Sequence, residues 1–370
     1  MFDLCRHPRL LQGLKAVYRL RWARARRSRD RAAAQRIRSE FYRGVWLKAA
    51  EKFAASTRFL EDDVMEIERG DFRVRVRQNE TPLDDYVTVR VAGNKPLTYR
   101  LLSEAGLPIP EHTRFTLANM RPAIEFLDER RRDCVVKPAH DTGGGIGVIT
   151  GVRSHRRLAH AAAAAAVVYG PELLIEEQVP GDNYRLLYLD GRLVDAVVRG
   201  APSVVGDGGS TVRELLARSN EGRLARGPAA CQSLVRADLE MRHTLAAQGL
   251  KLSSRPAAGT VIKLKSVVND NCGWENATAT DLLCEAIIDD GARAAAALGV
   301  RLAGIDVITA DPSVPLRESQ GVILEVNTSP GHHWHYHKRD GTFHVAALVL
   351  ESLLNEHSRR ISYSDAVLQS

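Results

Sequence analysis

Apolar residues recur along the chain with two different periods, which predict helices in some segments and strands in others. Helical spacing predicts helices at 9–38, 40–55, 95–110, 154–169, 211–219, 236–248, 282–299 and 344–356. Short apolar runs bounded by Gly, Pro and polar residues predict strands at 64–67, 72–76, 134–136, 146–149, 173–176, 184–189, 192–198, 301–309 and 321–326. The mixture predicts an α/β protein built from α+β lobes.

Changes in this pattern divide the chain into four regions. Residues 1–38 are predicted to form a basic amphipathic helical arm, and residues 39–94 a small N-terminal α/β lobe. Residues 95–356 form the main body, with a first lobe at 95–180 and a second lobe at 181–356 that includes an Arg-, Ala- and Gly-rich insertion at 220–259. Residues 357–370 form a C-terminal tail. The 370 residues are enough for several lobes with buried cores.

The formal net charge of +7 is concentrated at one end of the chain. Residues 1–38 hold twelve Lys or Arg against two acids, whereas the rest of the chain holds 40 basic and 43 acidic residues. Because the body is nearly neutral, we expect no nucleic acid partner. We expect the apolar side of the arm to pack on the body or on another subunit of a homodimer, with its basic side open to peripheral contacts.

Cysteine usage and hydropathy bear on the compartment. Five cysteines are scattered without a C-x-x-C pair, and an odd number argues against a closed disulfide framework. No apolar run approaches the roughly 20 residues that span a bilayer, and no apolar signal core opens the chain. We therefore expect a cytoplasmic protein with reduced thiols and no transmembrane segment.

A glycine-rich segment follows a short apolar strand that ends in a lysine. Cys134-Val-Val-Lys137-Pro138 leads into the loop from Asp141 to Gly147, which contains Gly143, Gly144, Gly145 and Gly147. Glycines let backbone N–H groups approach phosphate oxygens while the lysine supplies positive charge, so the segment indicates a phosphate site. A glycine-rich hairpin that binds nothing is the alternative.

Two later segments carry polar side chains on predicted strands. Glu176 and Glu177 precede a turn at Pro180, where an edge backbone can meet an adenine ring. Asp306 ends one strand, and Glu325 and Asn327 lie two residues apart on the next, so they share a face. Two carboxylates and an amide oxygen are the hard donors that Mg²⁺ prefers. Surface charges between apolar residues are the alternative.

Taken in this order, the motifs resemble the ATP-grasp superfamily, and in particular the ATP-grasp portion of cyanophycin synthetases and related amino-acid ligases. The resemblance covers about residues 95–353. It rests on Asn94-Lys95-Pro-Leu-Thr, Val136-Lys137-Pro with the glycine loop, Glu176-Glu-Gln-Val-Pro-Gly-Asp-Asn-Tyr-Arg185, Val205-Gly-Asp-Gly-Gly-Ser-Thr211, Lys263-Leu-Lys265 with Asn269, Asp306, and Glu325-Val-Asn327-Thr-Ser-Pro-Gly331. It implies an ATP-grasp fold in which a nucleotide is held between two α/β lobes.

The resemblance also implies roles for matching residues. Lys95 and Lys137 would hold the phosphates under the glycine loop, and Glu176, Glu177 and Val179 would meet adenine. Asp306, Glu325 and Asn327 would bind two Mg²⁺ ions, with Mn²⁺ as a substitute. Lys265 stands where relatives have an arginine near the γ-phosphate, and Arg185 or Arg199 would neutralise an acyl phosphate. Asn183 stands where many relatives have the acid that grips the ribose hydroxyls.

The segment Gly331-His-His-Trp-His335-Tyr-His337 follows the predicted metal strand, and we call it the histidine loop. In relatives this loop lines the acceptor pocket, so His335 is expected to contact the acceptor; a zinc site and simple packing are the alternatives.

The predicted function is a ligase that uses ATP and Mg²⁺ to join a small carboxylate to an amine through an acyl phosphate, releasing ADP and phosphate. Three alternatives stay open. The chain could modify a protein or peptide terminus, it could be a kinase or a ligase with a non-amine acceptor, or it could bind RNA or membranes through the arm beside a vestigial ATP site.

Overall fold

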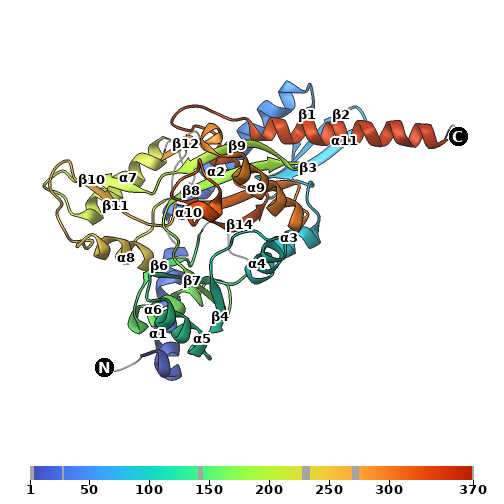
Figure 1. Ribbon diagram of the computed structural model, residues 1–370. Coiled ribbons are helices and arrows are strands. Elements are labelled where there is room, and N and C mark those ends of the chain that lie inside the picture. Colours follow the sequence, from blue (N-terminus) through green and yellow to red (C-terminus); the bar gives the residue numbers. More distant parts are fainter. Residues whose placement is uncertain (1–3, 27–28, 141–144, 227–233, 269–274, 369–370) are drawn as a thin grey trace.

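The computed structural model describes residues 4–26, 29–140, 145–226, 234–268 and 275–368, and it consists of several lobes (Figure 1). The α-helices are α1 (Pro8–Arg26), α2 (Arg29–Lys52), α3 (Tyr86–Ala92), α4 (Lys95–Glu104), α5 (Arg121–Arg130), α6 (His155–Ala165), α7 (Val212–Ala225), α8 (Leu239–Ala247), α9 (Glu285–Leu298), α10 (Leu316–Ser319) and α11 (Val345–Leu368). Short 3-10 helices cover Leu4–Arg6, Thr280–Leu282 and His332–Trp334.

Within the described ranges the strands pair into four antiparallel sheets. They are β1 (Ser56–Phe59), β2 (Val64–Arg69), β3 (Phe72–Arg77), β4 (His112–Thr116), β5 (Cys134–Pro138), β6 (Ile149–Val152), β7 (Glu172–Glu177), β8 (Asp182–Leu189), β9 (Arg192–Arg199), β10 (Ser203–Val205), β11 (Val261–Lys263), β12 (Asn276–Thr278), β13 (Leu302–Thr309) and β14 (Val322–Thr328). Their orders are β1-β2-β3, β4-β7-β5-β6, β12-β9-β8-β13-β14 and β10-β11. This confirms the predicted mixture of helix and strand.

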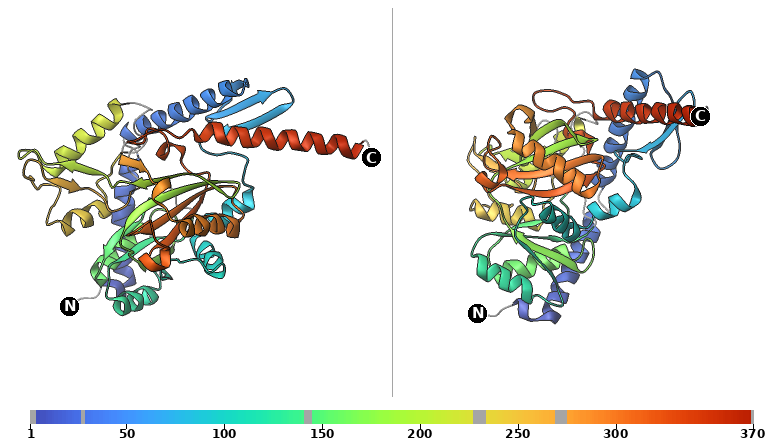
Figure 2. Two further views of the ribbon diagram at one scale, coloured as in Figure 1. Left: turned by 45° about the horizontal axis from the view of Figure 1, so that its top comes forward. Right: turned by 45° about the vertical axis from the view of Figure 1, so that its right-hand side comes forward.

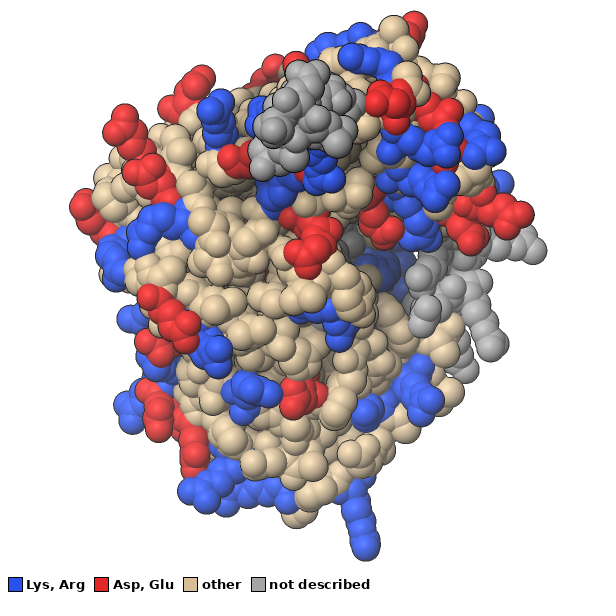
Figure 3. Space-filling model, turned by 90° about the vertical axis from the view of Figure 1, so that its right-hand side faces the viewer, with Lys and Arg blue, Asp and Glu red and all other residues tan. Residues whose placement is uncertain are grey.

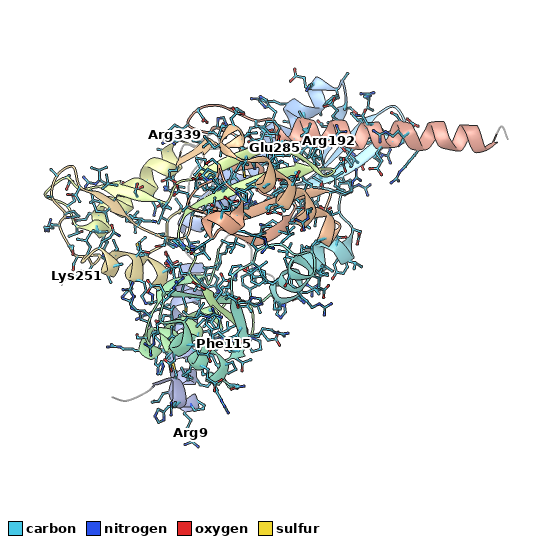
Figure 4. All side chains as sticks on the ribbon, viewed as in Figure 1. Arg9, Phe115, Arg192, Lys251, Glu285 and Arg339 are labelled. Carbon is cyan, nitrogen blue, oxygen red and sulfur yellow. The ribbon has the colours of Figure 1, made fainter. Side chains whose placement is uncertain are left out.

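The first lobe is the sheet β4-β7-β5-β6 covered by α5 and α6. Its core joins Phe115, Val136 and Ile175 of the strands to an alanine-rich face of α6. Figure 4 shows Phe115 within this lobe and Arg9 at the outer end of α1. Small alanine side chains let α6 lie close to the sheet, and Ala161, Ala162 and Ala165 are fully buried there.

The arm packs on the first lobe. Leu11 of α1 is fully buried in that core, and the Tyr18 hydroxyl lies 2.9 Å from His160 Nδ1 on α6. The next helix, α2, continues away from the lobe toward the N-terminal sheet, so the two helices run along one side of the molecule (Figure 2). The predicted helix at 9–38 is thus parts of two helices, α1 and α2.

The second lobe is the sheet β12-β9-β8-β13-β14, with α9 packed on one face. Ile287 and Leu298 of α9 share a core with Leu186 of β8 and with Tyr99 and Leu102 of α4. Helix α4 therefore packs with the second lobe, although its sequence precedes the strands of the first lobe.

The N-terminal sheet, α2 and α11 form one further core. Trp46 of α2, Ile67 of β2 and Leu350 of α11 are all fully buried within it. Both helices cross predicted boundaries, since α2 runs through position 38/39 and α11 runs through position 356/357. A helix continues while its backbone hydrogen bonds and apolar contacts continue, and a change in composition does not by itself end it.

A small subdomain is built from β10, β11, α7 and α8 around Val212, Met241 and Ile262. It spans more of the chain than the predicted insertion at 220–259, because the flanking strands and the start of α7 belong to its core. It also contacts the first lobe, where Thr150 Oγ1 donates a hydrogen bond to Glu240 of α8 at 3.3 Å.

Several elements differ from the predictions. The strand predicted at 146–149 lies at Ile149–Val152, after Gly145 and Gly147, which both adopt positive φ. Strands β1, β4, β10, β11 and β12 and helices α3, α5 and α10 were not predicted. Most of these are short, and short segments carry little periodicity.

None of the described helices is both long and apolar enough to cross a membrane. Acidic and basic side chains are interspersed over the face shown in Figure 3.

Replacing Leu11 by alanine is expected to destabilise the first lobe by about 2–5 kcal/mol, because it leaves a cavity where α1 docks. The measurement is urea unfolding followed by circular dichroism. Leu20→Ala on the same helix is the matched control, since Leu20 is 64% exposed and its loss should be nearly neutral. Equal destabilisation by the two substitutions would contradict the packing of α1 on the first lobe.

Candidate active site

One face of the second-lobe sheet brings together the predicted metal ligands and the two predicted arginines, and the strand register explains why. Directly opposed residues of antiparallel strands share a face, and so do residues two apart on one strand. Arg185 on β8 opposes Asp306 on β13, which opposes Glu325 on β14. The neighbouring row holds Asp195 on β9, Leu187, Gly304 and Asn327. We call this surface the polar face.

Asp306 lies between two buried arginines. Arg185 Nε and Nη2 donate to the two Asp306 carboxylate oxygens at 2.5 and 3.0 Å, and Arg199 Nη2 lies 3.1 Å from Oδ2. All three residues are at most 4% exposed. Bidentate pairing of this kind holds both the carboxylate and the guanidinium in a fixed orientation.

Charge governs the protonation of this trio. Burial alone would raise the pKa of Asp306, but Arg185 and Arg199 outweigh burial and hold that pKa below its ordinary value. Burial lowers the pKa of Arg199 to about 10, while attraction to Asp306 acts in the opposite direction. At neutral pH the trio therefore consists of one carboxylate and two guanidinium groups, with a net positive charge.

The other two predicted metal ligands lie beside Asp306. Glu325 Oε1 is 3.0 Å from Lys95 Nζ, and Asn327 Nδ2 donates to the carbonyl of Gly304 at 3.1 Å. Because that bond uses Nδ2, Oδ1 is the side-chain atom of Asn327 that can bind a cation. A carboxylate has about four lone-pair sites, so the contacts of Asp306 and Glu325 do not exhaust their capacity. The donor set fits a hard divalent cation.

A second network lies where the two lobes meet. Lys137 Nζ is 2.7 Å from Glu176 Oε2 and donates to the Tyr99 hydroxyl at 2.8 Å. The Tyr99 hydroxyl in turn lies 2.9 Å from Glu176 Oε2 and 3.1 Å from the carbonyl of Leu324 on β14. Tyr99 thus links β5, which carries Lys137, to β14, which carries the predicted metal ligands. Sequence reasoning missed Tyr99, because a tyrosine on a predicted amphipathic helix looks like a core residue.

The glycine loop begins next to Lys137. Gly145 and Gly147 have φ of +64° and +83°, a region that residues with a Cβ rarely adopt. A Cβ on Gly147 would also lie 3.0 Å from Pro138 Cγ. Gly143 and Gly144 lie outside the described residues. The described part of the loop therefore requires glycine for its conformation.

Four other predicted residues lie in different surroundings. Glu177 pairs with Arg132 at 2.8 Å, and Val179 is half-buried just after β7. Asn183 Oδ1 accepts a hydrogen bond from Arg199 Nε at 2.7 Å, which places this amide on the polar face. Lys265 is buried next to the α7–α8 subdomain and pairs with Asp238 at 2.8 Å.

The histidine loop covers the polar face. The Trp334 ring stacks against both arginines, with the Arg185 and Arg199 Cζ atoms 4.4 and 4.8 Å from the ring centroid. His335 is fully buried, and its Nδ1 lies 2.7 Å from Asp195 Oδ2. Burial lowers the pKa of His335, against the opposing effect of Asp195, so the ring is neutral at neutral pH. Among the described residues no group of three or more His, Cys, Asp or Glu side chains could hold a metal ion.

His332 is buried without hydrogen bonds from its ring. Its centroid lies 5.6 Å from that of Tyr42 and 5.8 Å from that of Trp46, and neither ring nitrogen has a hydrogen-bond partner in the described structure. Burial, together with His335 and Arg38, lowers the pKa of His332 to about 3. Helix α2 therefore supplies an aromatic support for the start of the histidine loop.

Acidification is expected to destabilise the protein through this residue. An unfolded histidine has a pKa of about 6.5, so below that pH the unfolded state takes up the proton first, and the loss continues down to the folded pKa. Going from pH 7.5 to 5.5 should cost about 1 kcal/mol from His332 alone, and nothing should be lost above pH 7.5. Urea unfolding at the two pH values measures the cost.

His332→Phe should reduce this pH dependence, because phenylalanine fills a similar volume and does not titrate. His7→Phe is the control, since His7 is exposed. His333 and His335, whose pKa values burial also lowers, will keep part of the dependence. An unchanged difference between the two pH values in His332→Phe would contradict the assignment.

The chain is similar to several known proteins, although no protein-family model matches it. It is 32% identical over 292 residues to the cyanophycin synthetase of Trichormus variabilis, covering 78% of this chain and 32% of that protein. It is 30% identical over 294 residues to the glutathione biosynthesis bifunctional protein GshAB of Streptococcus mutans, covering 76% and 38%. The chain thus spans about a third of the length of the curated relatives it matches.

A solved structure agrees with the fold. The chain superposes on a bifunctional glutathione synthetase from Pasteurella multocida with a TM-score of 0.52 and 24% identity, covering 82% of this chain and 42% of that one. The similarity in fold and the similarity in sequence both agree with the motifs. The chain belongs to the ATP-grasp superfamily and resembles one portion of the cyanophycin synthetases.

Proposed function

We propose that the chain is a ligase that uses ATP to join a small carboxylate to an amine, releasing ADP and phosphate. The observation that carries the proposal is the polar face, where two buried arginines, two carboxylates and an amide lie in three neighbouring rows of one sheet. An array with this much positive charge beside a cation site suits a reaction that concentrates negative charge. The similarity to a cyanophycin synthetase and to a glutathione biosynthesis protein supports the same class of reaction.

Asp306, Glu325 and Asn327 would hold Mg²⁺, with Mn²⁺ as a substitute, and two ions are proposed. When bound, the metal offsets phosphate charge. Lys95 and Lys137 would bind the phosphates of ATP, and the glycine loop would exclude water from them. Both lysines are already held in place by carboxylates, Glu325 and Glu176, so little ordering is needed on binding. Glu177 and Val179 would meet the adenine, and Asn183 would lie near the ribose.

The carboxylate substrate would be phosphorylated by ATP, since a free carboxylate is a poor electrophile. Arg185 and Arg199 would bind the acyl phosphate and the oxyanion that forms when the amine attacks. His335 would receive a proton from the amine, a task that suits a neutral imidazole. Lys265, which pairs with Asp238, would approach the γ-phosphate.

The test is ADP release from ATP and Mg²⁺ in the presence of pairs of amino acids and small carboxylic acids, with mass spectrometry of the products. Hydroxylamine added in place of the amine traps an acyl phosphate as a hydroxamate. An amide or hydroxamate that carries the supplied acid would support the proposal. A stable phosphorylated product would instead indicate a kinase. Turnover only with a peptide or protein acceptor would indicate a ligase that modifies chain termini.

A further inference from the structure

Asp195 lies on the polar face but is not one of the predicted site residues. It lies on β9, four residues before Arg199, so both side chains leave the strand on the same face. Asp195 is 4% exposed and accepts hydrogen bonds from two groups, His335 Nδ1 at 2.7 Å and Lys338 Nζ at 2.9 Å. Burial alone would raise its pKa, but His335 and Lys338 outweigh burial and keep the carboxyl ionised.

This contact determines which ring nitrogen of His335 carries the proton. An ionised carboxylate only accepts hydrogen bonds, so Nδ1 of a neutral His335 must carry the hydrogen. Nε2 then holds the lone pair. This Nε2 is buried and has no hydrogen-bond partner in the described structure. A buried lone pair without a partner is costly in a folded protein, which is a reason to look for a group that will use it.

The neighbouring row of the sheet contains a second unpartnered buried atom. Asp195, Leu187 and Gly304 oppose one another across β9, β8 and β13. A Cβ on Gly304 would lie 2.7 Å from Arg185 Nη1, so this nitrogen lies directly over Gly304. Nη1 is buried and has no hydrogen-bond partner, although Nε and Nη2 of the same guanidinium bind Asp306. A proton acceptor and a cationic donor therefore lie over one row of the sheet.

We propose that Asp195 is a positioning residue that holds His335 with its proton on Nδ1, so that Nε2 takes a proton from an acceptor that arrives as an ammonium ion. The inference rests on the proposed ligase function and specifies its second half. It also narrows the acceptor to an amine that is protonated at neutral pH, such as a primary aliphatic amine, because only that class needs the base.

In the proposed step a C–N bond replaces the C–O bond at the acyl carbon. One proton passes from the ammonium nitrogen to His335 Nε2, and the freed lone pair forms the C–N bond at the acyl carbon. Arg185 Nη1 donates to the oxyanion of the tetrahedral intermediate. The C–O bond to phosphate then breaks with its electron pair on phosphate, which takes the second nitrogen proton. Asp195 stabilises the imidazolium while it exists, and His335 later releases its proton to solvent.

The first test is Asp195→Asn, which keeps the side-chain size and removes the charge. An asparagine amide can donate to Nδ1, which moves the ring proton to Nε2 and blocks it as a base. With a mixture of the twenty amino acids as acceptor, amide formation should fall by about 10²–10⁴-fold. Hydroxamate formation with hydroxylamine, a nucleophile that is neutral at pH 7, should change by no more than about threefold, because it needs no base. A parallel fall of both products would overturn the proposal.

Lys338→Met is the comparison variant. It removes one of the two groups that lower the Asp195 pKa but leaves the hydrogen bond from His335, so amide formation should fall much less than in Asp195→Asn. If Lys338→Met and Asp195→Asn lost amide formation equally, Asp195 would act through the ion pair, and the proposal would be wrong.

The second test reads the ring directly and needs no substrate. In protein labelled with ¹⁵N-histidine, long-range ¹H–¹⁵N spectra should show His335 as the Nδ1–H tautomer in the wild type and as the Nε2–H tautomer in Asp195→Asn. His335→Gln identifies the signal. The same tautomer in both proteins would refute the positioning role. Absence of hydroxamate from the wild type would refute the ligase function instead, so the two failures are distinguishable.

Discussion

Glu325→Gln is expected to lower Mg²⁺-dependent ATP turnover by at least about 100-fold while leaving the fold intact. Glutamine has nearly the same volume but supplies neither the charge for the cation nor the ion pair with Lys95, which is 3.0 Å away. The expected change is a loss of turnover with a large rise in the Mg²⁺ concentration needed for half-maximal rate. The measurement is ADP release across a Mg²⁺ titration, together with the thermal midpoint.

The matched control for this change is Glu351→Gln. Glu351 is an exposed glutamate on α11, which contributes no residue to the polar face. It should leave both the rate and the Mg²⁺ dependence unchanged. Wild-type turnover in excess EDTA would rule out the metal site, and so would a Glu325→Gln protein with normal Mg²⁺ dependence.

Gly304→Ala is expected to have a comparable effect on activity and a larger one on stability. A Cβ there would lie 2.7 Å from both Arg185 Nη1 and Pro330 Cβ. Arg185 cannot move aside easily, because two of its nitrogens bind Asp306 and its guanidinium lies over Trp334. We expect a loss of about 1–3 kcal/mol in the free energy of unfolding from overpacking, and a fall in turnover of at least about 100-fold because Arg185 is displaced.

Gly222→Ala is the matched control. Gly222 lies within α7, and a Cβ there would have no heavy atom within 4 Å. Alanine should be neutral or stabilise this helix by about 0.5–1 kcal/mol, because it restricts the unfolded chain. Urea unfolding and ADP release measure both variants. If Gly304→Ala kept full activity, then close packing of Arg185 over Gly304 would not matter to the site.

Several residues of the candidate site could be predicted from the local sequence pattern. Asp306, Glu325 and Asn327 were expected to share a face because side chains two apart on a strand do so, and the register of β13 and β14 places them together. The strand with Lys137 and the glycine loop follow from the same reading of short apolar runs and glycines. These signals are local, since each depends on a few consecutive residues.

The partners of these residues could not be predicted in the same way. Arg185, Arg199 and Asp306 come from three different strands, and their pairing depends on the order β9-β8-β13, which no local pattern encodes. Tyr99 and Asp195 were missed for the same reason, because a tyrosine on a helix and an aspartate on a strand have no special spacing. Their roles arise from neighbours that are distant in the sequence, from 38 residues away for Lys137 and Tyr99 to 140 for Asp195 and His335.

The sequence by itself determined which polar side chains share a face of a strand and where glycines occur, and these features indicated the class of reaction. Side-chain alternation and glycine conformation are properties of short segments, so they can be predicted without the fold. Only the tertiary structure decided that the arm packs on the first lobe, that α2 and α11 run past the expected boundaries, and that the histidine loop closes over the polar face. Those outcomes depend on which apolar surfaces meet, and burial of surface is a non-local quantity that sums over the whole fold.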